Sequence, residues 1–456
     1  MGLPLWCALS SHPVLHAGNI VRRERCGGAT SGCAQRAAAL VTPSQPTIGA
    51  LAGWYAPCLE ARRWNGGPST SNSRGERSIL NRQAGTVESR GTWRFGGFVI
   101  SLLRGLSPER ERWERSLVDA GVPLALPHRA AWMTLNPGVR ESWLLCISDA
   151  SGRPCGAVAL QVSPSRALPG SLLLRVERFG HGLPVAAHEA ALRVIALLAR
   201  RNRRVLRLYL ETFTINQSER LALEGHLSAL GFTRTPSARC YEHTLVLPLE
   251  ADEEGILASL HRTARANIRS AAKYRVRVAP ITDPALFPRL DAIAVETFER
   301  TGGRYAPHDW ARIVAIGAQA PAASRLVGLF RDDAEGVESL VAFGWGCGHG
   351  DHASYSSAGS TRKIDRRIPL VYPVLWDLIL WAKRNDARFF DLGGVTDGGL
   401  DSGDPLGGIS DFKRYFSDRV VHVGSEWSFE PRPMQAQAAR MMKSASSILS
   451  RVLARA

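Results

Sequence analysis

The pattern of apolar and polar positions becomes regular from about residue 98 onward. Ser107 before Pro108 is a helix-start signal, and Ser151-Gly152 with Pro154 marks a turn between two apolar runs. The pattern predicts, in order, a helix over 107–120, an antiparallel hairpin of strands 142–148 and 157–162, a strand over 171–176, a helix over 184–202 and a strand over 205–211.

A similar order of elements returns later in the chain. It predicts a hairpin of strands 340–345 and 352–357, a helix from Pro369 to about Asn385 and a strand over 388–392. The C-terminal ends of the two predicted helices also have similar sequences, Ala199-Arg200-Arg201-Asn202 and Ala382-Lys383-Arg384-Asn385. The repeat predicts two copies of one α/β unit.

Each predicted unit has a mixed sheet, because its hairpin is antiparallel while its strand–helix–strand step requires a crossover, which is nearly always right-handed. We expect a first domain over residues 98–248 and a second over 249–430, with the boundary near Pro248–Ala251.

Both ends of the chain differ from these two units. Residues 1–97 contain eleven Arg and four Glu but no Lys, no Asp and no periodicity. This composition predicts a disordered or misassigned N-terminal extension. Residues 431–456 predict a basic amphipathic helix, with Met441, Ala445, Ile448, Leu449, Val452 and Leu453 on one face. Such a helix favours peripheral contact with an anionic membrane at its inner face.

The chain of 456 residues carries a formal charge of +16 and a pI of about 10.1, which indicates an anionic partner. Five of its 57 basic residues are Lys, so part of the charge reflects Arg-rich coding. The eight Cys form no CxxC pair, and no apolar run approaches the roughly 18 residues of a membrane helix. We expect a cytoplasmic monomer with neither a metal site nor a disulfide framework.

Residues 256–278 predict one basic amphipathic helix. Ile256, Leu260, Ala264, Ile268 and Ala271 form its apolar stripe, and Arg262, Arg265, Arg269 and Lys273 lie on another face. Four neighbouring cations are typical of a solvated face or of a face that binds phosphates. Both interpretations stay open.

Two further segments carry candidate chemistry. His308 and Asp309 resemble a base with its orienting carboxylate, but adjacent residues of a helix point about 100° apart, so a helix cap is the better interpretation. The loop 360–369 precedes a helix and contains Arg362 and Lys363, where cations and a helix N-terminus can meet a pyrophosphate. An exposed basic loop is the alternative.

The most specific segment is the strand Phe389-Phe390-Asp391-Leu392, which ends in Gly393-Gly394. A glycine pair at a strand end allows close approach of a substrate to the backbone. It is followed by Phe412-Lys413, where a rare lysine is flanked by aromatic residues. A lysine ammonium is a compact point charge whose pKa can be tuned.

The run His261 to Lys273, the motif Asp391-Leu392-Gly393-Gly394 and the later Phe412-Lys413 with Phe416 resemble the Fem family of peptidyltransferases. The resemblance covers about residues 100–430. It implies tandem GNAT-like domains that attach amino acids from aminoacyl-tRNA to the stem peptide of peptidoglycan precursors. It also implies that Lys413 is the functional lysine at the aminoacyl-tRNA end and that Arg265 and Arg269 occupy the family's arginine positions.

One departure from the family and one related group of proteins widen the choice of function. The long helical arm that some Fem proteins use for tRNA has no room between Ala279 and Arg325. Related GNAT-like proteins with the same helix and Gly-Gly motif are acyltransferases of the cellulose and exopolysaccharide type.

Three hypotheses follow: aminoacyl-tRNA-dependent transfer to an amine of a lipid-linked precursor, acyl-CoA-dependent N-acylation of a polysaccharide or small-molecule amine, and a non-catalytic binding protein. Beyond an acyl-CoA donor, we expect no cofactor. Lys413, Asp391 and Tyr355 are the candidate catalytic residues, although Asp391 can also serve as a turn carboxylate and Tyr355 as a packed phenol. The candidate donor-binding residues are Arg262, Arg265, Arg269, Arg362, Lys363, Gly393, Gly394 and Phe412.

Overall fold

A computed structural model describes residues 91–134, 139–236, 240–300, 305–364, 368–399, 404 and 407–453. The expectation for residues 1–90 lies outside this part of the chain. The described residues up to Arg440 belong to one compact unit, and those from Met441 belong to a second.

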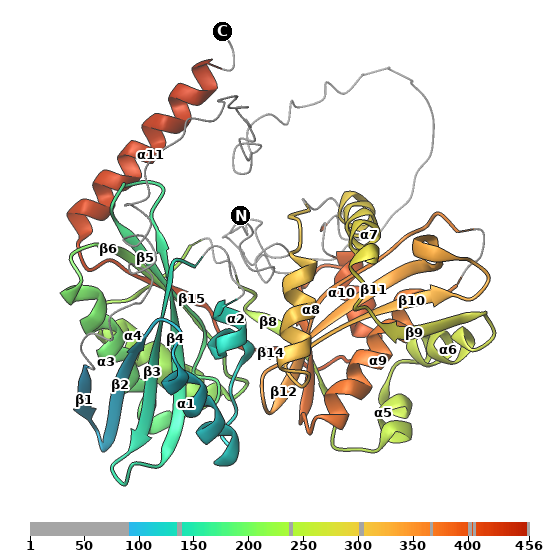
Figure 1. Cartoon of the computed structure of the whole chain (residues 1–456), viewed down its shortest axis with the longest axis horizontal. Coiled ribbons are helices and arrows are strands. Elements are labelled where there is room, and N and C mark those ends of the chain that lie inside the picture. The colour runs from blue at the N-terminus through green and yellow to red at the C-terminus, as the bar shows by residue number, and fades with distance from the viewer. Residues whose placement is uncertain are drawn as a thin grey trace, which may run out of the picture. The chain divides into compact units, whose positions relative to one another are not determined.

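The first half of this unit is built on a mixed sheet (Figure 1). Its described strands, in spatial order, are β1 (Thr92–Phe95), β2 (Phe98–Arg104), β3 (Glu141–Asp149), β4 (Pro154–Pro164), β5 (Leu172–Phe179), β6 (Val205–Thr212), β15 (Glu426–Phe429) and β7 (Thr233–Arg234). β5 and β6 are parallel and the other neighbours are antiparallel. The sheet therefore begins at Thr92, slightly before the expected domain start.

Helices of the first half are α1 (Pro108–Asp119), α2 (Ala130–Thr134), α3 (Val185–Arg201) and α4 (Gln217–Ala229), with a short 3-10 turn at Leu126–His128. α3 packs its apolar face, including Ala191 and Ile195, against Leu174 of β5 and Leu208 of β6. Because α3 connects β5 to its parallel neighbour β6, it is the crossover that the sequence predicted.

The second half repeats this plan. Its described strands, in spatial order, are β14 (Val420–His422), β8 (His243–Pro248), β13 (Phe389–Gly394), β12 (His352–Ser360), β11 (Leu340–Gly348), β10 (Ser324–Arg331) and β9 (Val276–Pro280). β12 and β13 are parallel and are joined through α9 (Val371–Arg384), whose Val374 and Leu378 pack on the sheet with Val341 and Phe390. The predicted α/β class with two mixed sheets is confirmed.

The remaining helices of the second half are α5 (Glu253–Ser259), α6 (Arg262–Ala271), α7 (Phe287–Arg300), α8 (Trp310–Gln319) and α10 (Gly407–Arg414), with 3-10 turns at Pro284–Leu286 and Gly336–Ser339. α7 and α8 pack through Leu290, Ile293 and Ile316 into a core shared with Phe343. They fill the segment between β9 and β10.

The two halves exchange strands close to an edge of each sheet, where β15 lies beside the edge strand β7 and β8 lies beside the edge strand β14. β8 follows the first-half elements in the chain but pairs with β13 and β14, while β15 follows the second-half elements but pairs with β6 and β7 (Figure 1). The expected boundary at residues 248–251 thus falls after a strand that belongs to the second sheet. Each exchanged strand pairs with two strands of the sheet that it joins, so four backbone ladders tie the two halves together.

The predicted single helix over 256–278 is wrong, because α5 and α6 are separate. Leu260 has extended backbone angles (φ −68°, ψ 157°), and His261 begins α6 by accepting a hydrogen bond from Thr263 N on its side chain. Arg265 donates to the carbonyls of Ala258 and Leu260 at 2.8 and 2.6 Å, which satisfies the end of α5. The apolar stripe is nevertheless correct, since Ile256, Leu260 and Ala264 are buried.

The predicted C-terminal helix exists as α11 (Pro433–Leu453). Ala436 and Ala439 near its start pack against Leu206 of the first half. The described part of the chain contains no helix that is both long and apolar enough to cross a bilayer.

Candidate active site at the split between β12 and β13

The two parallel strands of the second half separate partway along their length. β12 and β13 pair at His352–Phe389, Ala353–Phe390 and Ser354–Asp391. Beyond that point β12 continues along β11 as far as Ser360, while β13 continues along β8 to the Gly394–Thr244 pair. The split that opens between them is bordered by Tyr355 on β12 and by Gly393 on β13.

Lys413 of α10 reaches this split from one side. Its side chain is only 2% exposed, and Nζ donates a hydrogen bond of 2.6 Å to the carbonyl of Gly394. Nζ also lies 5.7 Å from the centre of the Tyr355 ring. Burial lowers the pKa of Lys413 to about 8, although the charge of Asp391 opposes this shift. At neutral pH the site therefore holds a buried ammonium, for which the described part of the chain supplies one hydrogen-bond acceptor, the carbonyl of Gly394.

Gly393 shapes the turn beneath that ammonium. Its φ is +76°, and a Cβ there would lie 3.4 Å from both Lys413 Nζ and the carbonyl oxygen of Tyr355. A side chain at Gly394 would meet the Cβ of Tyr241 at 2.6 Å. The absence of side chains at Gly393 and Gly394 thus allows Lys413, Tyr355 and Tyr241 to pack closely against the backbone of this turn.

Asp391 is buried and holds the turn in place. Its carboxylate accepts hydrogen bonds from Tyr241 OH at 2.7 Å, from Gly393 N at 2.8 Å and from Thr244 Oγ1. Arg178 Nη2 lies 4.0 Å from the same carboxylate. These contacts occupy the oxygens of Asp391, so the geometry favours the turn-carboxylate interpretation over a general base.

Tyr355 is a weak candidate for a base. Burial raises the pKa of its phenol to about 12, so the group is neutral at physiological pH. Its position beside Lys413 and Gly393 favours a wall of the site.

Aromatic packing fixes the helix that carries Lys413. The rings of Phe412 and Phe416 lie 5.1 and 5.7 Å from Tyr372 of α9, and 5.4 Å from each other. Phe412 thus has a packing partner in α9. The structure brings Lys413, Asp391, Tyr355, Gly393 and Gly394 together as one group, with Phe412 in its supporting layer.

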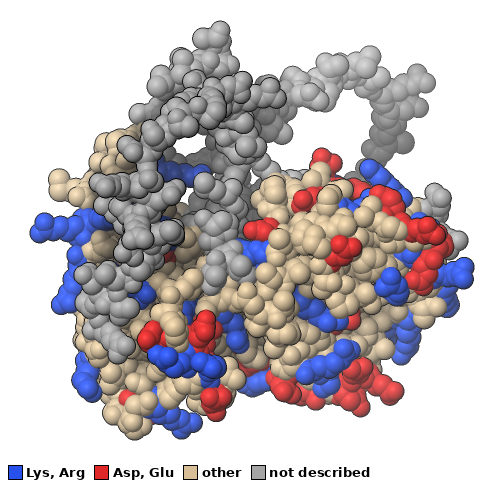
Figure 2. All heavy atoms as spheres, in the orientation of Figure 1, with Lys and Arg blue, Asp and Glu red and all other residues tan. Residues whose placement is uncertain are grey.

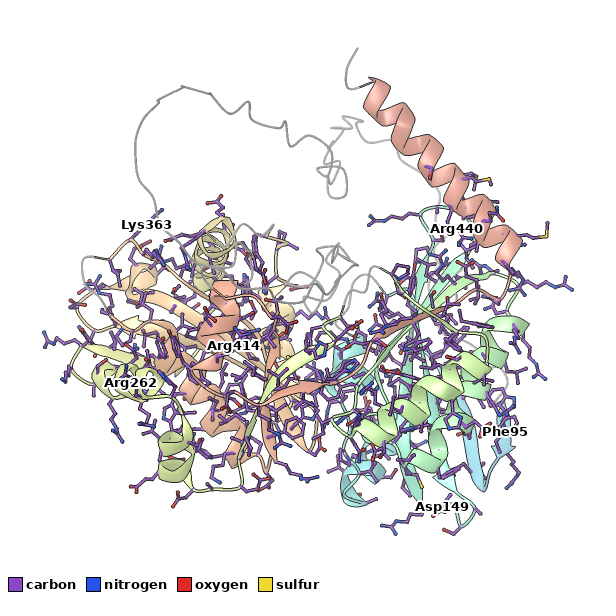
Figure 3. The ribbon with its side chains drawn as sticks, turned by 180° about the vertical axis from the view of Figure 1, so that it is seen from behind. Phe95, Asp149, Arg262, Lys363, Arg414 and Arg440 are labelled. Atoms are coloured by element: carbon purple, nitrogen blue, oxygen red, sulfur yellow. The ribbon has the colours of Figure 1, made fainter. Side chains whose placement is uncertain are left out.

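The basic candidates do not join this group in the described contacts. Arg265 is used to cap α5, whereas Arg262 and Arg269 are exposed on α6. Figure 3 shows Arg262 and Lys363 on separate parts of the second half. On the face visible in Figure 2, basic side chains are spread widely and do not form one patch.

The loop after β12 is partly closed to an anion. Arg362 and Lys363 have exposed side chains, but Arg362 N donates to Glu296 Oε1 at 2.7 Å and Lys363 N donates to Thr361 Oγ1 at 3.1 Å. These two amides are therefore already occupied by protein acceptors. Residues 365–367 of the loop lie outside the described part.

The helix-cap interpretation of the 308–309 segment is confirmed. Asp309 is the N-cap of α8 and accepts from Arg312 N at 3.0 Å. His308 is buried against Trp310, with ring centres 4.3 Å apart, and burial lowers its pKa to about 3. His308 is a neutral core residue.

A buried polar seam, not expected from the sequence, joins the two halves next to the site. Arg178 at the end of β5 has φ 51°, contacts His352 Nε2 of the second half and lies over the ring of Phe213 at 3.5 Å. His352 is stacked between Phe213 and Phe389 at 5.1 and 4.6 Å. The amino-acid sequence does not indicate that an arginine adopts a left-handed backbone conformation. The sequence analysis therefore did not identify Arg178.

His352 of the seam also contacts His181 and Asp351, and the ligand atoms of these three residues lie within 4.8 Å of one another, as a metal site requires. Their hydrogen bonds argue against such a site. His181 Nε2 contacts the carbonyl of His349 at 2.6 Å, so this nitrogen carries a proton. Arg178 donates to His352 Nε2, so Nδ1 carries the proton toward Asp351 at 2.8 Å. The residues fit a hydrogen-bonded network better than a cation.

A surface hollow of about 410 Å³ lies elsewhere, against the first sheet. Its lining residues are Gly91, Trp93, Leu102, Arg104, Trp143, Leu198, Arg201 and Asn202. It shares no residue with the split.

Comparison with known proteins bears on the fold. No protein-family model matches the chain, and no curated protein matches its sequence. Among solved structures, FemX is 13% identical with a TM-score of 0.59, covering 74% of this chain and all of its own. L-PGS from Bacillus licheniformis is 12% identical (TM-score 0.44; 77% of this chain, 98% of its own).

A tandem GNAT protein from the clavulanic acid biosynthesis pathway is 15% identical to the chain (TM-score 0.42; 73% of this chain, 98% of its own). The similarity to FemX supports the predicted Fem-type fold of two GNAT-like halves.

Proposed function

We propose that the chain is an acyltransferase that joins an acyl group to an amine at the split between β12 and β13. The observation that carries this proposal is the buried Lys413 ammonium, which points at the Gly393-Gly394 turn where two parallel strands separate. Among the described residues, this ammonium has one hydrogen bond. Burying a charged group with so few partners lowers the stability of the folded protein. Such a cost is typical of a site that is selected for chemistry.

Lys413 would act on the acyl carbonyl. Attack of an amine on an ester or thioester develops negative charge on the carbonyl oxygen, and a fixed cation in a water-poor site stabilises that charge. An ammonium has three N–H donors, of which Gly394 accepts one. No second acceptor binds Nζ among the residues that the structure describes, so the other two N–H groups could donate to the oxyanion or to a phosphate of the donor.

The donor that we favour is aminoacyl-tRNA, with an amine of a peptidoglycan precursor or a similar acceptor. The Fem-like motifs and the Fem-type fold support it, and the exposed Arg262 and Arg269 on α6 supply cations for a phosphate backbone. Contact with lipid-linked acceptors through α11 at the membrane surface belongs to the same proposal.

Acyl-CoA is the second candidate donor, for one specific reason. The segment between β9 and β10 is occupied by α7 and α8, and only residues 301–304 of it lie outside the described part. A long tRNA-binding arm does not fit there. The side chains of Arg362 and Lys363 could bind a small pyrophosphate without such an arm.

Thermal unfolding separates the candidates. Charged tRNA, uncharged tRNA, acetyl-CoA and CoA are added separately, because a ligand at about 100 times its dissociation constant adds about 2.7 kcal/mol to the free energy of unfolding. We expect charged tRNA to raise Tm more than the CoA ligands do. A rise with acetyl-CoA alone would select the second donor, and no rise with any of the four would contradict the proposal.

Charge reversal tests where the donor lies. Arg262→Glu with Arg269→Glu should abolish most of the tRNA-induced rise in Tm and leave the Tm of the free protein unchanged, because both side chains are exposed. Arg203→Glu, at an exposed turn of the first half, is the matched control. Equal loss in the control would indicate a nonspecific charge effect and remove α6 from the site.

A further inference from the structure

Arg178 of the first half interacts with both strands that border the split. β12 and β13 pair as far as Ser354 and Asp391, and the split begins after that pair. There the guanidinium of Arg178 contacts Nε2 of His352 on β12, and its Nη2 lies 4.0 Å from the carboxylate of Asp391 on β13. The side chain of Arg178 is 1% exposed. One buried cation therefore lies against both strands where they are about to separate.

The backbone of Arg178 has a conformation that residues with a side chain disfavour. Its φ is 51°, in the left-handed region. Asp386 is the other described non-glycine residue with a positive φ, and it lies in the turn that ends α9, where such residues are common. Arg178 belongs to β5, so the end of a helix does not explain its conformation. A conformation of this kind persists where contacts from other segments hold it, and it is concentrated at functional sites.

Aromatic packing fixes the direction of the guanidinium. Cζ of Arg178 lies 3.5 Å from the centre of the Phe213 ring, and Phe213 stacks on His352 with ring centres 5.1 Å apart. A planar guanidinium can stack on a ring and donate hydrogen bonds in its own plane, whereas a lysine ammonium cannot reproduce both contacts. The contacts of Arg178 therefore require the shape of arginine as well as its charge.

Asp391 connects Arg178 with Lys413. The Asp391 carboxylate accepts a hydrogen bond from Gly393 N at 2.8 Å. The carbonyl of the next residue, Gly394, accepts the hydrogen bond of 2.6 Å from Lys413 Nζ. An ion pair and two hydrogen bonds thus lead from the guanidinium to the ammonium, and a displacement of Asp391 would move the acceptor that orients Nζ. A misplacement of about 1 Å at a reacting group can lower a rate by about 10²-fold.

We propose that Arg178 is a positioning residue of the acyl-transfer site, which holds Asp391 beside β12 and thereby keeps Lys413 Nζ directed into the split. This inference rests on the proposed function. Arg178 acts through Asp391 and the Gly393-Gly394 turn and not on the substrates themselves. The first half thereby completes a site whose candidate catalytic residues all lie in the second half.

A purely structural role for this cation is the alternative. Glu211 of β6 is also buried, and burial raises its pKa to about 7, while the charge of Arg178 opposes this rise. In the alternative, Arg178 serves only to offset the buried charge of Glu211. The two roles have different consequences, because Glu211→Gln removes this carboxylate and leaves Asp391 in place.

The first test observes the turn directly and does not depend on transfer activity. The chain contains three Leu-Gly pairs, whose glycines are Gly231, Gly393 and Gly407. Labelling the full chain with ¹³C at the leucine carbonyl and with ¹⁵N in glycine therefore leaves three backbone amides in an HNCO spectrum. We expect Arg178→Met to shift the Gly393 amide, because its hydrogen bond to the Asp391 carboxylate is displaced, and to leave the other two amides in place.

Arg175→Met is the matched control. Arg175 is a buried arginine of the same strand, and it forms an ion pair of 3.2 Å with Glu426 of β15 in the first sheet. This variant should leave the Gly393 amide at its wild-type position. Arg178→Gly is the second test variant, since it removes the same guanidinium and suits the positive φ. An unmoved Gly393 amide in both Arg178 variants, an equal shift in Arg175→Met, or equal shifts of all three amides overturns the inference.

The second test is a double-mutant cycle read by transfer. With whichever donor is active, Arg178→Met should lower kcat by about 10²-fold and leave KM nearly unchanged. Arg178→Lys should recover part of this loss, because it keeps the charge but not the planar shape. In a Lys413→Met background, Arg178→Met should add little, because the two residues act as one unit. In a Glu211→Gln background, the full loss should remain.

The outcomes separate the inference from the proposed function on which it rests. A loss that multiplies with that of Lys413→Met, or that disappears in Glu211→Gln, would show a structural role and overturn the inference while leaving the proposed function intact. A Gly393 shift that is confined to the Arg178 variants, without transfer from either donor, would support the contact of Arg178 with the turn and reject the proposed function.

Discussion

Replacing Lys413 with methionine separates its effect on folding from its effect on chemistry. Methionine is unbranched like lysine, is one atom shorter and carries no charge. The ordinary pKa of lysine is 10.5, and burial lowers that of Lys413 to about 8. The folded protein therefore disfavours the ammonium by roughly 3 kcal/mol at neutral pH, since each pKa unit corresponds to about 1.36 kcal/mol.

The sign follows from proton linkage. Between pH 8 and 10.5 the unfolded chain binds more protons at this lysine, so stability rises with pH in that window and the full penalty applies below pH 8. Lys413→Met removes the penalty but leaves the carbonyl of Gly394 without its donor, which costs about 1 to 3 kcal/mol. The variant should be as stable as the wild type or about 2 kcal/mol more stable at pH 7.

Activity should change in the opposite direction. Loss of a fixed positive charge at the oxyanion costs about 10² to 10³ in rate. Lys413→Arg keeps the charge in a larger, planar shape and should recover activity only in part. Urea unfolding at pH 7 and single-turnover transfer rates are measured on the same preparations.

Lys383→Met is the matched control, because Lys383 Nζ also donates to a backbone carbonyl, that of Leu249, at 3.1 Å. We expect it to lose about 1 kcal/mol and to keep its transfer rate. If Lys413→Met keeps wild-type rates, or if it loses stability as Lys383→Met does, the reasoning about a functional buried charge is refuted.

Three substitutions and one truncation have further measurable outcomes. Gly393→Ala should cost about 1 to 2 kcal/mol from its positive φ and also lower transfer by crowding Nζ, whereas Gly152→Ala, with φ +88° and open space, should show the stability loss alone; equal transfer in both would refute crowding. Arg265→Ala should lower Tm by exposing two carbonyls of α5, and an unchanged Tm would place Arg265 outside the helix cap. Between pH 4.5 and 7 the folded state binds the extra proton at Glu211, so wild type should lose roughly 3 kcal/mol relative to Glu211→Gln as pH rises; parallel urea-unfolding curves at pH 5 and 8 would contradict this. Removing residues 434–456 should weaken sedimentation with anionic vesicles, and undiminished binding would reject a membrane role for α11.

Most of the local structure could be predicted from the sequence, because helices, strands and turns depend on the periodicity of apolar residues and on the positions of turn-forming residues. The helix from Pro108, the hairpin of β3 and β4 and the crossover through α3 all follow from patterns within short windows. The candidate group of Lys413, Asp391 and Gly393 was also recognisable, because all three lie within 25 residues of one another in a segment rich in glycine and aromatic residues.

The pairing of strands that are distant in the chain could not be predicted from the sequence. The exchange of β8 and β15 joins strands whose partners lie in the other half of the chain, and no local pattern specifies such a partner. The break between α5 and α6 was missed because the apolar spacing continues through Leu260 while its backbone does not. Glu211 reads as an ordinary polar residue of a strand, and its burial depends on tertiary packing.

Transfer of a labelled acyl group tests the central claim most directly. Wild-type protein is incubated with tRNA carrying a radiolabelled amino acid, or with radiolabelled acetyl-CoA, and with a peptidoglycan stem peptide that has a free amine. The same reactions are run with the N-acetylated peptide as control. We predict that label enters a base-stable amide from charged tRNA, only with the free amine, and that Lys413→Met lowers this rate by about 10² to 10³. Absence of labelled amide from both donors with folded wild-type protein would contradict an acyltransferase site at the split between β12 and β13.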